Sequence, residues 1–208
     1  HILIRNGRVI DPASGLDQVG DVAIADGKIL AVGTAPTHFT PTQTIDASGC
    51  WVLPGLVDLA VRLREPGHEH AGMLHSEMQA AVAGGVTSLV CPPDTDPVLD
   101  EQGLVEMLKF RAEKQHKARL FPMGALTQGL KGDTLTEMAE LTESGCVAFG
   151  QADVPMANTQ ALARALAPSP ALLLLDASMP SQRPARSIRR RRSRVIGNSG
   201  CGVSGTGR

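Results

Sequence analysis

The fold is decided by the stretch LPGLVDLAVRLREPG at residues 53–67. It continues the apolar pair Trp51-Val52 and opens as a buried strand that runs toward Leu63. It ends in a polar segment, Arg64-Glu65, followed by the turn-forming pair Pro66-Gly67. Strand and helix patterns alternate after this stretch but not before it, so it marks the start of an α/β domain.

Four strand–helix units are predicted from residue 51 onward. Each helical pattern follows a short apolar run, and Gly84-Gly85 ends the first helix. Such an alternation predicts a parallel sheet covered by helices. A closed eight-stranded barrel needs roughly 250 residues. We therefore predict a partial TIM-like (β/α)8 barrel, limited to its first four βα units, over residues 51–167. The expected strands are 52–63, 86–91, 120–123 and 147–149, and the expected helices are 72–84, 100–116, 134–143 and 156–166.

Residues 1–50 have the pattern of a small β-rich module. Short apolar runs alternate with turn signals, and Asn6-Gly7 and Asp26-Gly27 are both typical of two-residue hairpin turns. Strands this short bury little surface by themselves. We expect a small N-terminal β-sandwich that packs on the following domain.

Residues 168–208 differ in composition from the rest of the chain. This tail holds eight arginines, four of them consecutive at 189–192, and one acid, Asp176, whereas the remainder of the chain is acidic. One interpretation is an arm that binds nucleic acid. The favoured one is a disordered, non-native or frame-shifted C-terminus that replaces the second half of the barrel, because the change falls within a structural repeat.

The overall composition excludes several classes of protein. The formal net charge is -1 and 42% of residues are hydrophobic, so the chain as a whole does not indicate a nucleic-acid or membrane partner. No apolar run is long enough for a transmembrane helix, and the first residues lack the features of a signal peptide. The four scattered cysteines form no CxxC pair, so we expect reduced thiols and a cytoplasmic protein.

Three further motifs agree with the stretch at 53–67. They are NGRVIDP at 6–12, AGGVT at 83–87 and CPPDTDP at 91–97. Together the four motifs resemble the dihydroorotase family of the amidohydrolase superfamily, over residues 2 to about 166. The resemblance implies a barrel hydrolase that holds zinc at the carboxyl ends of its strands.

The metal positions that the resemblance implies are degenerate. An Asp-x-His-x-His pattern on the first barrel strand would place two imidazoles on one face, since side chains two apart point the same way. Here Asp58 is present, but Ala60 and Arg62 stand at the histidine positions. Alanine has no donor atom, and a guanidinium has no lone pair and repels a divalent cation.

The segment after the fourth strand departs from the family in the same way. A Ser-Asp-Asp-Gly-like run is expected there, but Gln151 and Ala152 replace its carboxylates, and Asp153 falls at the glycine. The sequence offers a literal His-x-His at His68-Glu69-His70, with His75 nearby. We interpret His68 and His70 as exposed loop histidines. The sequence thus predicts no metal, no cofactor and no catalytic residue.

Part of a substrate site is retained as a vestige. The resemblance implies that Arg64 would pair with a substrate carboxylate, with a local salt bridge to Glu65 as the alternative. The family's Asn-Thr-Asn-Pro loop reads Asp94-Thr95-Asp96-Pro97 here, so Asp96 occupies a former substrate-binding position. Two anions there would need a cation, and we hypothesise that Arg62 pairs with Asp94 or Asp96 and replaces the metal.

Three functions compete at this stage. The resemblance favours a non-catalytic pseudoenzyme that associates with the catalytic chain of aspartate transcarbamoylase in de novo pyrimidine biosynthesis. The alternative is an active metal-dependent hydrolase of cyclic amides, of the dihydroorotase, hydantoinase or allantoinase type. The third is a nucleic-acid-binding protein that uses the tail. Because half a barrel exposes a sheet edge, we also expect aggregation, a homo-oligomer or dependence on a partner.

Overall fold

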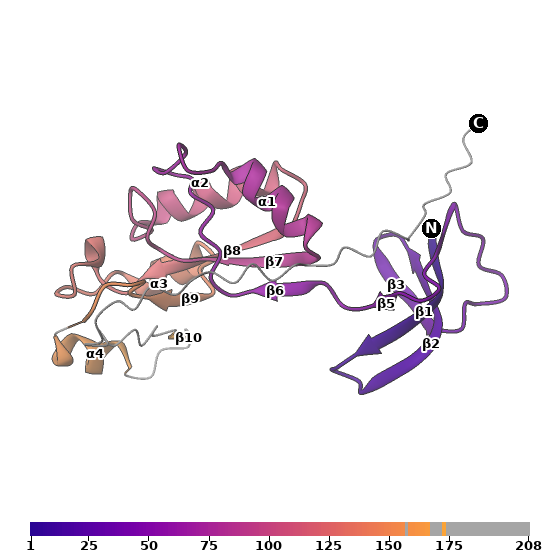
Figure 1. The fold of residues 1–208 in the computed structure, drawn as a ribbon. Helices are drawn as coiled ribbons and strands as arrows, with labels where there is room; N and C mark the ends of the chain where they lie inside the picture. The colour runs from indigo at the N-terminus through magenta and orange to yellow at the C-terminus, as the bar shows by residue number, and fades with distance from the viewer. Residues whose placement is uncertain (157, 167–171, 174–208) are drawn as a thin grey trace, which may run out of the picture. The chain divides into compact units, whose positions relative to one another are not determined.

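The computed structural model describes residues 1–156, 158–166 and 172–173. Two compact units divide this part of the chain, the first ending at Pro54 and the second beginning at Gly55. The first is all β, and the second alternates strands and helices (Figure 1).

The first unit is a single mixed sheet. Its strands are β1 (Ile2–Asp11), β2 (Leu16–Ala25), β3 (Lys28–Gly33), β4 (Gln43–Asp46) and β5 (Trp51–Val52). They follow the order β3-β2-β1-β4, and β5 also pairs with β1. Strands β2 and β3 are antiparallel to their neighbours, whereas β4 and β5 run parallel to β1. Within the described residues this unit has no second layer, so the predicted β-sandwich is corrected to one sheet.

One of the two predicted hairpin turns is wrong. Asp26-Gly27 does connect β2 to β3, with both residues at positive φ. Asn6-Gly7 instead lies inside β1, where the register against β2 shifts between Ile4 and Gly7 and Asn6 has a φ of 61°. A β-bulge uses the same left-handed backbone as a tight turn, which is why the local signal was ambiguous.

The second unit contains the predicted parallel sheet, but the predicted first strand at 52–63 is wrong in its bounds: only Leu56–Asp58 is a strand of this sheet, and Val52 pairs with the first unit. Its strands follow the chain order β6-β7-β8-β9-β10, and every neighbouring pair is parallel. The elements are β6 (Leu56–Asp58), α1 (Leu74–Ala83), β7 (Val86–Cys91), α2 (Gln102–Glu113), β8 (Arg119–Ala125), η1 (Gln128–Leu130), α3 (Met138–Glu143), β9 (Ala148–Gly150), α4 (Thr159–Ala165) and β10 (Leu172–Leu173).

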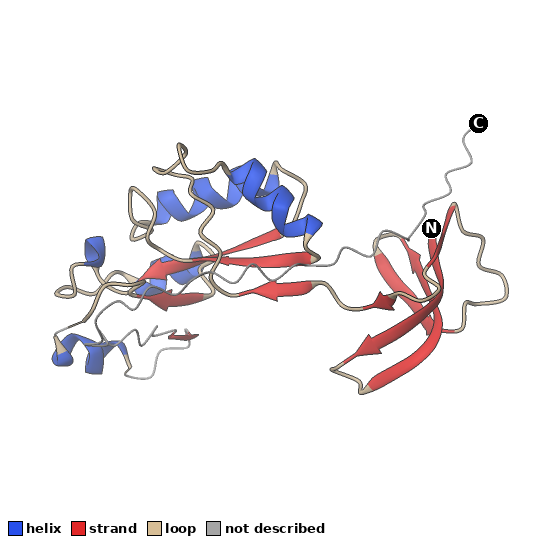
Figure 2. Ribbon diagram, viewed as in Figure 1, coloured by secondary structure: helices blue, strands red, loops and turns tan. Residues whose placement is uncertain are grey.

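The helices bury their apolar sides on this sheet. Figure 2 shows α1 and α2 side by side over one face of the sheet. Leu74 and Met78 of α1 and Leu108 of α2 pack in one cluster with Leu89 of β7. Phe149 of β9 anchors a second cluster with side chains of α2, α3 and α4. Burial of these apolar side chains stabilises the packing of the helices on the sheet.

The fourth barrel strand, β9, has a partner. Leu172 and Leu173 pair with Ala148 and Phe149 in parallel register, so a fifth strand begins where the sequence suggested an unpaired edge. Other residues of the predicted tail lie outside the described part of the chain. The arginine run at 189–192 is among them, and so the nucleic-acid arm and the frame shift both remain predictions.

Two of the described cysteines, Cys91 and Cys146, are buried free thiols. Burial raises the pKa of Cys91 to about 12 and that of Cys146 to about 11. The expectation of reduced thiols is therefore confirmed for these two cysteines and stays a prediction for the others. Among the described helices, none combines the length and the apolar character needed to cross a membrane.

Candidate functional site

The polar side chains of interest follow the carboxyl ends of parallel strands. Arg62 lies four residues beyond β6, Asp94 three residues beyond β7 and Asp153 three residues beyond β9. A hydrogen bond from the Val61 amide to the Val90 carbonyl, 2.9 Å long, continues the β6–β7 pairing as far as Arg62. Parallel strands end on the same side of a sheet, and so the three loops converge there.

Arg62 binds both carboxylates. Its Nε lies 2.5 Å from Oδ2 of Asp94, and its Nη2 lies 2.7 Å from Oδ2 of Asp153. The hydrogen bond to Asp94 is the main reason why the pKa of Arg62 is raised. We call these three residues the strand-end cluster. The hypothesised pairing of Arg62 with Asp94 or Asp96 is confirmed through Asp94, and Asp153 is a further partner that the sequence did not reveal.

The other former histidine position contributes nothing to this cluster. Ala60 is exposed, and its amide donates to Oδ1 of Asp58 at 3.0 Å. The carboxylate of Asp58 thereby closes a local turn just after β6. This end of the strand provides a small side chain and a turn, rather than a pair of imidazoles.

Gln151 has a structural role after β9. It is 5% exposed, accepts a hydrogen bond from the Thr127 hydroxyl at 3.0 Å and donates to the Leu130 carbonyl at 2.8 Å. Thr127 in turn accepts from the Gly132 amide. Ala152 follows with a φ of 48°, so the chain turns before Asp153 and directs that carboxylate to Arg62. The amide of Gln151 therefore holds a loop where the family pattern has a carboxylate.

Of the two vestigial substrate positions, Arg64 lies beside the strand-end cluster and Asp96 lies apart from it. Arg64 is exposed, and within the described residues no acid lies within salt-bridge distance of it. The alternative pairing with Glu65 is wrong, because Glu65 binds Arg111 at 2.9 Å and the Leu74 amide at 3.1 Å. Arg64 and Arg62 line a small cavity of about 90 Å³ together with His68 and Thr95. Asp96 is exposed and does not line this cavity.

The loop histidines are not gathered into a site. The rings of His68 and His70 are 6.2 Å apart and edge to face. Glu69 accepts hydrogen bonds from the Gly67 amide, which lowers its pKa, and His75 is bound to Gln115 at 2.9 Å. Among the residues that the structure describes, no three of His, Cys, Asp or Glu are placed to hold a metal ion.

The donor set at the strand ends does not fit zinc. Zinc sites use imidazole, thiolate and carboxylate donors. Here the central group is a guanidinium, which offers only N–H donors and a fixed positive charge. It occupies both carboxylates that could otherwise have acted as ligands. The two ion pairs of Arg62 thus connect the loops that a metal ion would connect in the family pattern.

Comparison with known proteins identifies the family. The dihydro-orotase-like family model matches residues 49–172. The chain belongs to the dihydroorotase-like family. It is 50% identical over 165 residues to a dihydroorotase-like protein of Pseudomonas putida, and 43% identical over 166 residues to a dihydroorotase of Geobacter metallireducens. These matches cover 79% and 80% of the chain but 39% of each relative, so the chain spans about two fifths of their length.

Solved structures agree on the fold of this dihydroorotase-like chain. An L-hydantoinase from Arthrobacter aurescens matches 72% of the chain with a TM-score of 0.62 at 24% identity. A D-hydantoinase matches 83% of it with a TM-score of 0.63 at 21% identity. The chain covers 32% and 39% of those proteins, respectively. At this identity the likeness supports the architecture alone.

Proposed function

We propose that this chain is a non-catalytic dihydroorotase-like protein with a structural role. Its partner would be the catalytic chain of aspartate transcarbamoylase, which it helps to assemble in de novo pyrimidine biosynthesis. We expect this assembly to be cytoplasmic. A homo-oligomer of the dihydroorotase-like chain within the complex is compatible with the same role.

The observation that carries the proposal is the double ion pair of Arg62. A water bound to zinc is acidified by the metal, and the family's hydrolysis depends on that effect. Arg62 already pairs with the carboxylates of Asp94 and Asp153, so a metal ion could use them as ligands only by displacing the guanidinium. Restoring a metal would therefore require the loss of two ion pairs as well as new ligands.

The names of the relatives also support a non-catalytic dihydroorotase-like protein. The Pseudomonas putida and Pseudomonas aeruginosa proteins, each 50% identical to the chain, are named dihydroorotase-like, whereas proteins named dihydroorotase match at 41–44%. A fold can be retained for a partner surface after its chemistry is lost. The partner itself is an inference from the family resemblance.

Co-expression with the Pseudomonas putida transcarbamoylase catalytic chain tests this proposal. The complex would be separated by size-exclusion chromatography and assayed for carbamoyl transfer, dihydroorotate hydrolysis and bound zinc. We expect co-migration and carbamoyl transfer, without hydrolysis or stoichiometric zinc. The longer Pseudomonas putida dihydroorotase-like relative is the matched control for co-migration.

Two results would overturn parts of the proposal separately. Elution of the two chains in separate peaks, while the longer relative co-migrates, would remove the partner. Zinc-dependent hydrolysis of dihydroorotate or another cyclic amide in this chain's own peak would establish the active hydrolase instead.

A further inference from the structure

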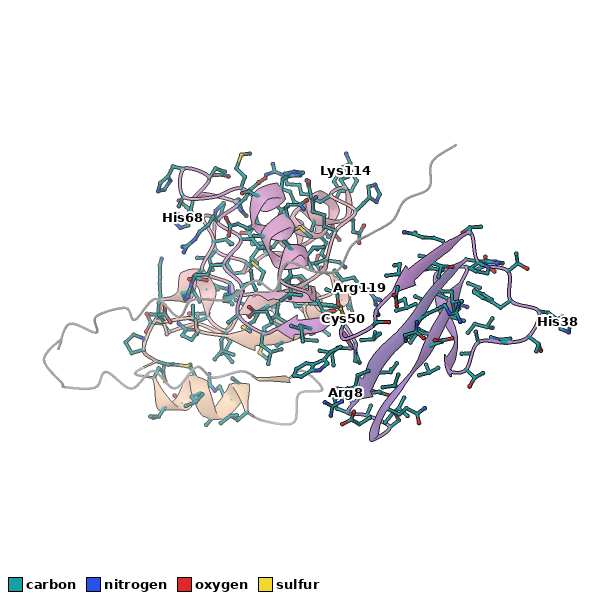
Figure 3. All side chains as sticks on the ribbon, turned by 45° about the vertical axis from the view of Figure 1, so that its right-hand side comes forward. Arg8, His38, Cys50, His68, Lys114 and Arg119 are labelled. Atoms are coloured by element: carbon teal, nitrogen blue, oxygen red, sulfur yellow. The ribbon has the colours of Figure 1, made fainter. Side chains whose placement is uncertain are left out.

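A basic groove lies at the amino ends of β8 and β9, away from the strand-end cluster. It is a cavity of about 510 Å³ between the last turns of α2, the loop before β8 and the start of β9. We define it by Lys109, Lys117, Arg119, Phe121 and Val147, which all line it. In Figure 3, Arg119 and Lys114 lie at one end of the second unit and His68 lies at the other.

The rim of the basic groove is cationic. Its lining includes three basic side chains, Lys109, Lys117 and Arg119, together with His116. Glu113 is the one acidic residue among the described lining residues. Lys109 is held in place by a hydrogen bond to the Ser144 carbonyl at 2.9 Å, and Lys117 is held by Gln79. Arg119 is exposed and, within the described part of the chain, forms no ion pair. The groove thus combines positioned cations with one guanidinium that is available to a ligand.

The floor of the basic groove is apolar and only partly covered. Leu120 and Phe121 are half-buried, and Val147 is 43% exposed although it immediately precedes the buried strand β9. An exposed apolar floor inside a polar rim is the usual form of a protein interaction site. It offers a place for one apolar side chain of a ligand to lose its contact with water.

We propose that the basic groove binds an acidic segment of a partner protein that carries an apolar side chain. Carboxylates of the segment would pair with Arg119 and the two lysines, and the apolar side chain would contact Val147 and Phe121. Complementary charge selects and orients such a partner, while the apolar contact supplies most of the affinity. This inference goes beyond the proposed function and does not depend on transcarbamoylase.

The same features disfavour nucleic acid as the ligand. A nucleic-acid site needs cations spaced along a path of phosphates. Here the cations surround one cavity rather than follow a path. Glu113 would repel a phosphate and a peptide carboxylate alike, but a peptide also carries backbone amides that can donate to it. The two ligand classes therefore give opposite expectations for one binding experiment.

The test measures binding of labelled peptides to the complete 208-residue chain by fluorescence anisotropy. The probe is a peptide of aspartates and glutamates around one central leucine. The comparison ligands are the same peptide with serine in place of leucine, a lysine-rich peptide with the leucine, and a single-stranded oligonucleotide. We expect the first probe to bind most tightly, and Arg119→Glu to weaken it roughly five- to tenfold.

Matched variants make the result specific to the groove. Lys131→Glu reverses an exposed charge in the loop beyond β8, outside the groove, and should leave affinity unchanged. Val147→Ser should weaken the leucine probe without weakening the serine probe. Equal effects of Arg119→Glu and Lys131→Glu, stronger binding of the oligonucleotide than of the acidic peptide, or no acidic-peptide binding at low salt would each overturn the proposal.

Discussion

Arg62 connects the loop after β7 with the loop after β9 by binding one carboxylate from each. Replacing it with alanine would leave Asp94 and Asp153 facing one another without a cation. Its side chain is 37% exposed and that of Asp94 is 28% exposed, so solvent screens part of the interaction. We expect Arg62→Ala to lower the free energy of unfolding by about 1 kcal/mol. Urea denaturation of both proteins would measure this difference.

Arg119→Ala is the matched control for Arg62→Ala, since it removes an arginine of the same unit that forms no ion pair with any residue the structure describes. It should change the free energy of unfolding by less than Arg62→Ala does. A double-mutant cycle would test the coupling of Arg62 with Asp94. If Asp94→Ala changes the free energy of unfolding by the same amount in the unsubstituted chain and in the Arg62→Ala variant, the pairing contributes no stability.

The thiol of Cys91 gives a pH-dependent prediction at the same scale. Its pKa is raised from 9.0 to about 12 by burial, so folding favours the neutral thiol. This contribution to stability is complete below pH 9 and is lost as the pH rises from about 9 toward 12. Iodoacetamide should therefore modify Cys91 slowly at pH 8 in the folded chain and rapidly in urea. Peptide mass spectrometry would measure the rate of modification of Cys91 in each state. Equal rates in the folded chain and in urea would contradict the burial of this thiol.

At the scale of elements, Gln151 joins the end of β9 to the loop around η1. Gln151→Glu is nearly isosteric, but its ionised carboxylate cannot donate to the Leu130 carbonyl. An unsatisfied buried carbonyl and a buried charge together should lower the free energy of unfolding by about 2 kcal/mol at pH 7. A protonated carboxyl can donate, so part of the stability should return as the pH falls. Unfolding curves at pH 5 and pH 7.5 would test this.

Gln128→Glu is the control for that variant, because Gln128 is exposed in the same loop. It should cost little at either pH. A Gln151→Glu protein as stable as the unsubstituted chain at pH 7.5 would show that the amide does not hold the loop.

The sequence predicted the elements of the second unit better than the contacts between their loops. Alternating apolar runs and helical periods place β7, α2 and β9 close to their expected ranges, because each depends on local patterns. The pairing of Arg62 with Asp94 was predictable since both follow parallel strands. Its pairing with Asp153 depends on the left-handed turn at Ala152, which no local pattern indicated. The burial of Gln151 depends on residues more than twenty positions away and was likewise missed.

At the scale of the whole molecule, the chain holds a sheet whose first strand is incompletely covered. Strand β6 pairs with β7, and within the described residues its other edge has no partner. Leu56 and Val57 point to opposite faces, as successive strand residues do, and both are exposed. Natural edge strands are protected by charges or prolines, which β6 lacks apart from Asp58 at its end. The matched segment is 39% of the length of the Pseudomonas putida relative.

The uncovered edge predicts self-association that one charge should reduce. Val57 is 62% exposed, so Val57→Lys places a cation on the edge without opening a cavity. We expect the unsubstituted chain to elute as concentration-dependent oligomers and Val57→Lys to shift toward the monomer, as measured by size-exclusion chromatography with light scattering. Val82→Lys adds the same charge to an exposed apolar position on α1 and should not have this effect. A monodisperse, cooperatively melting monomer from the unsubstituted chain would mean that β6 is protected by something other than association. Equal shifts in the two variants would instead attribute association to net charge rather than to the strand edge.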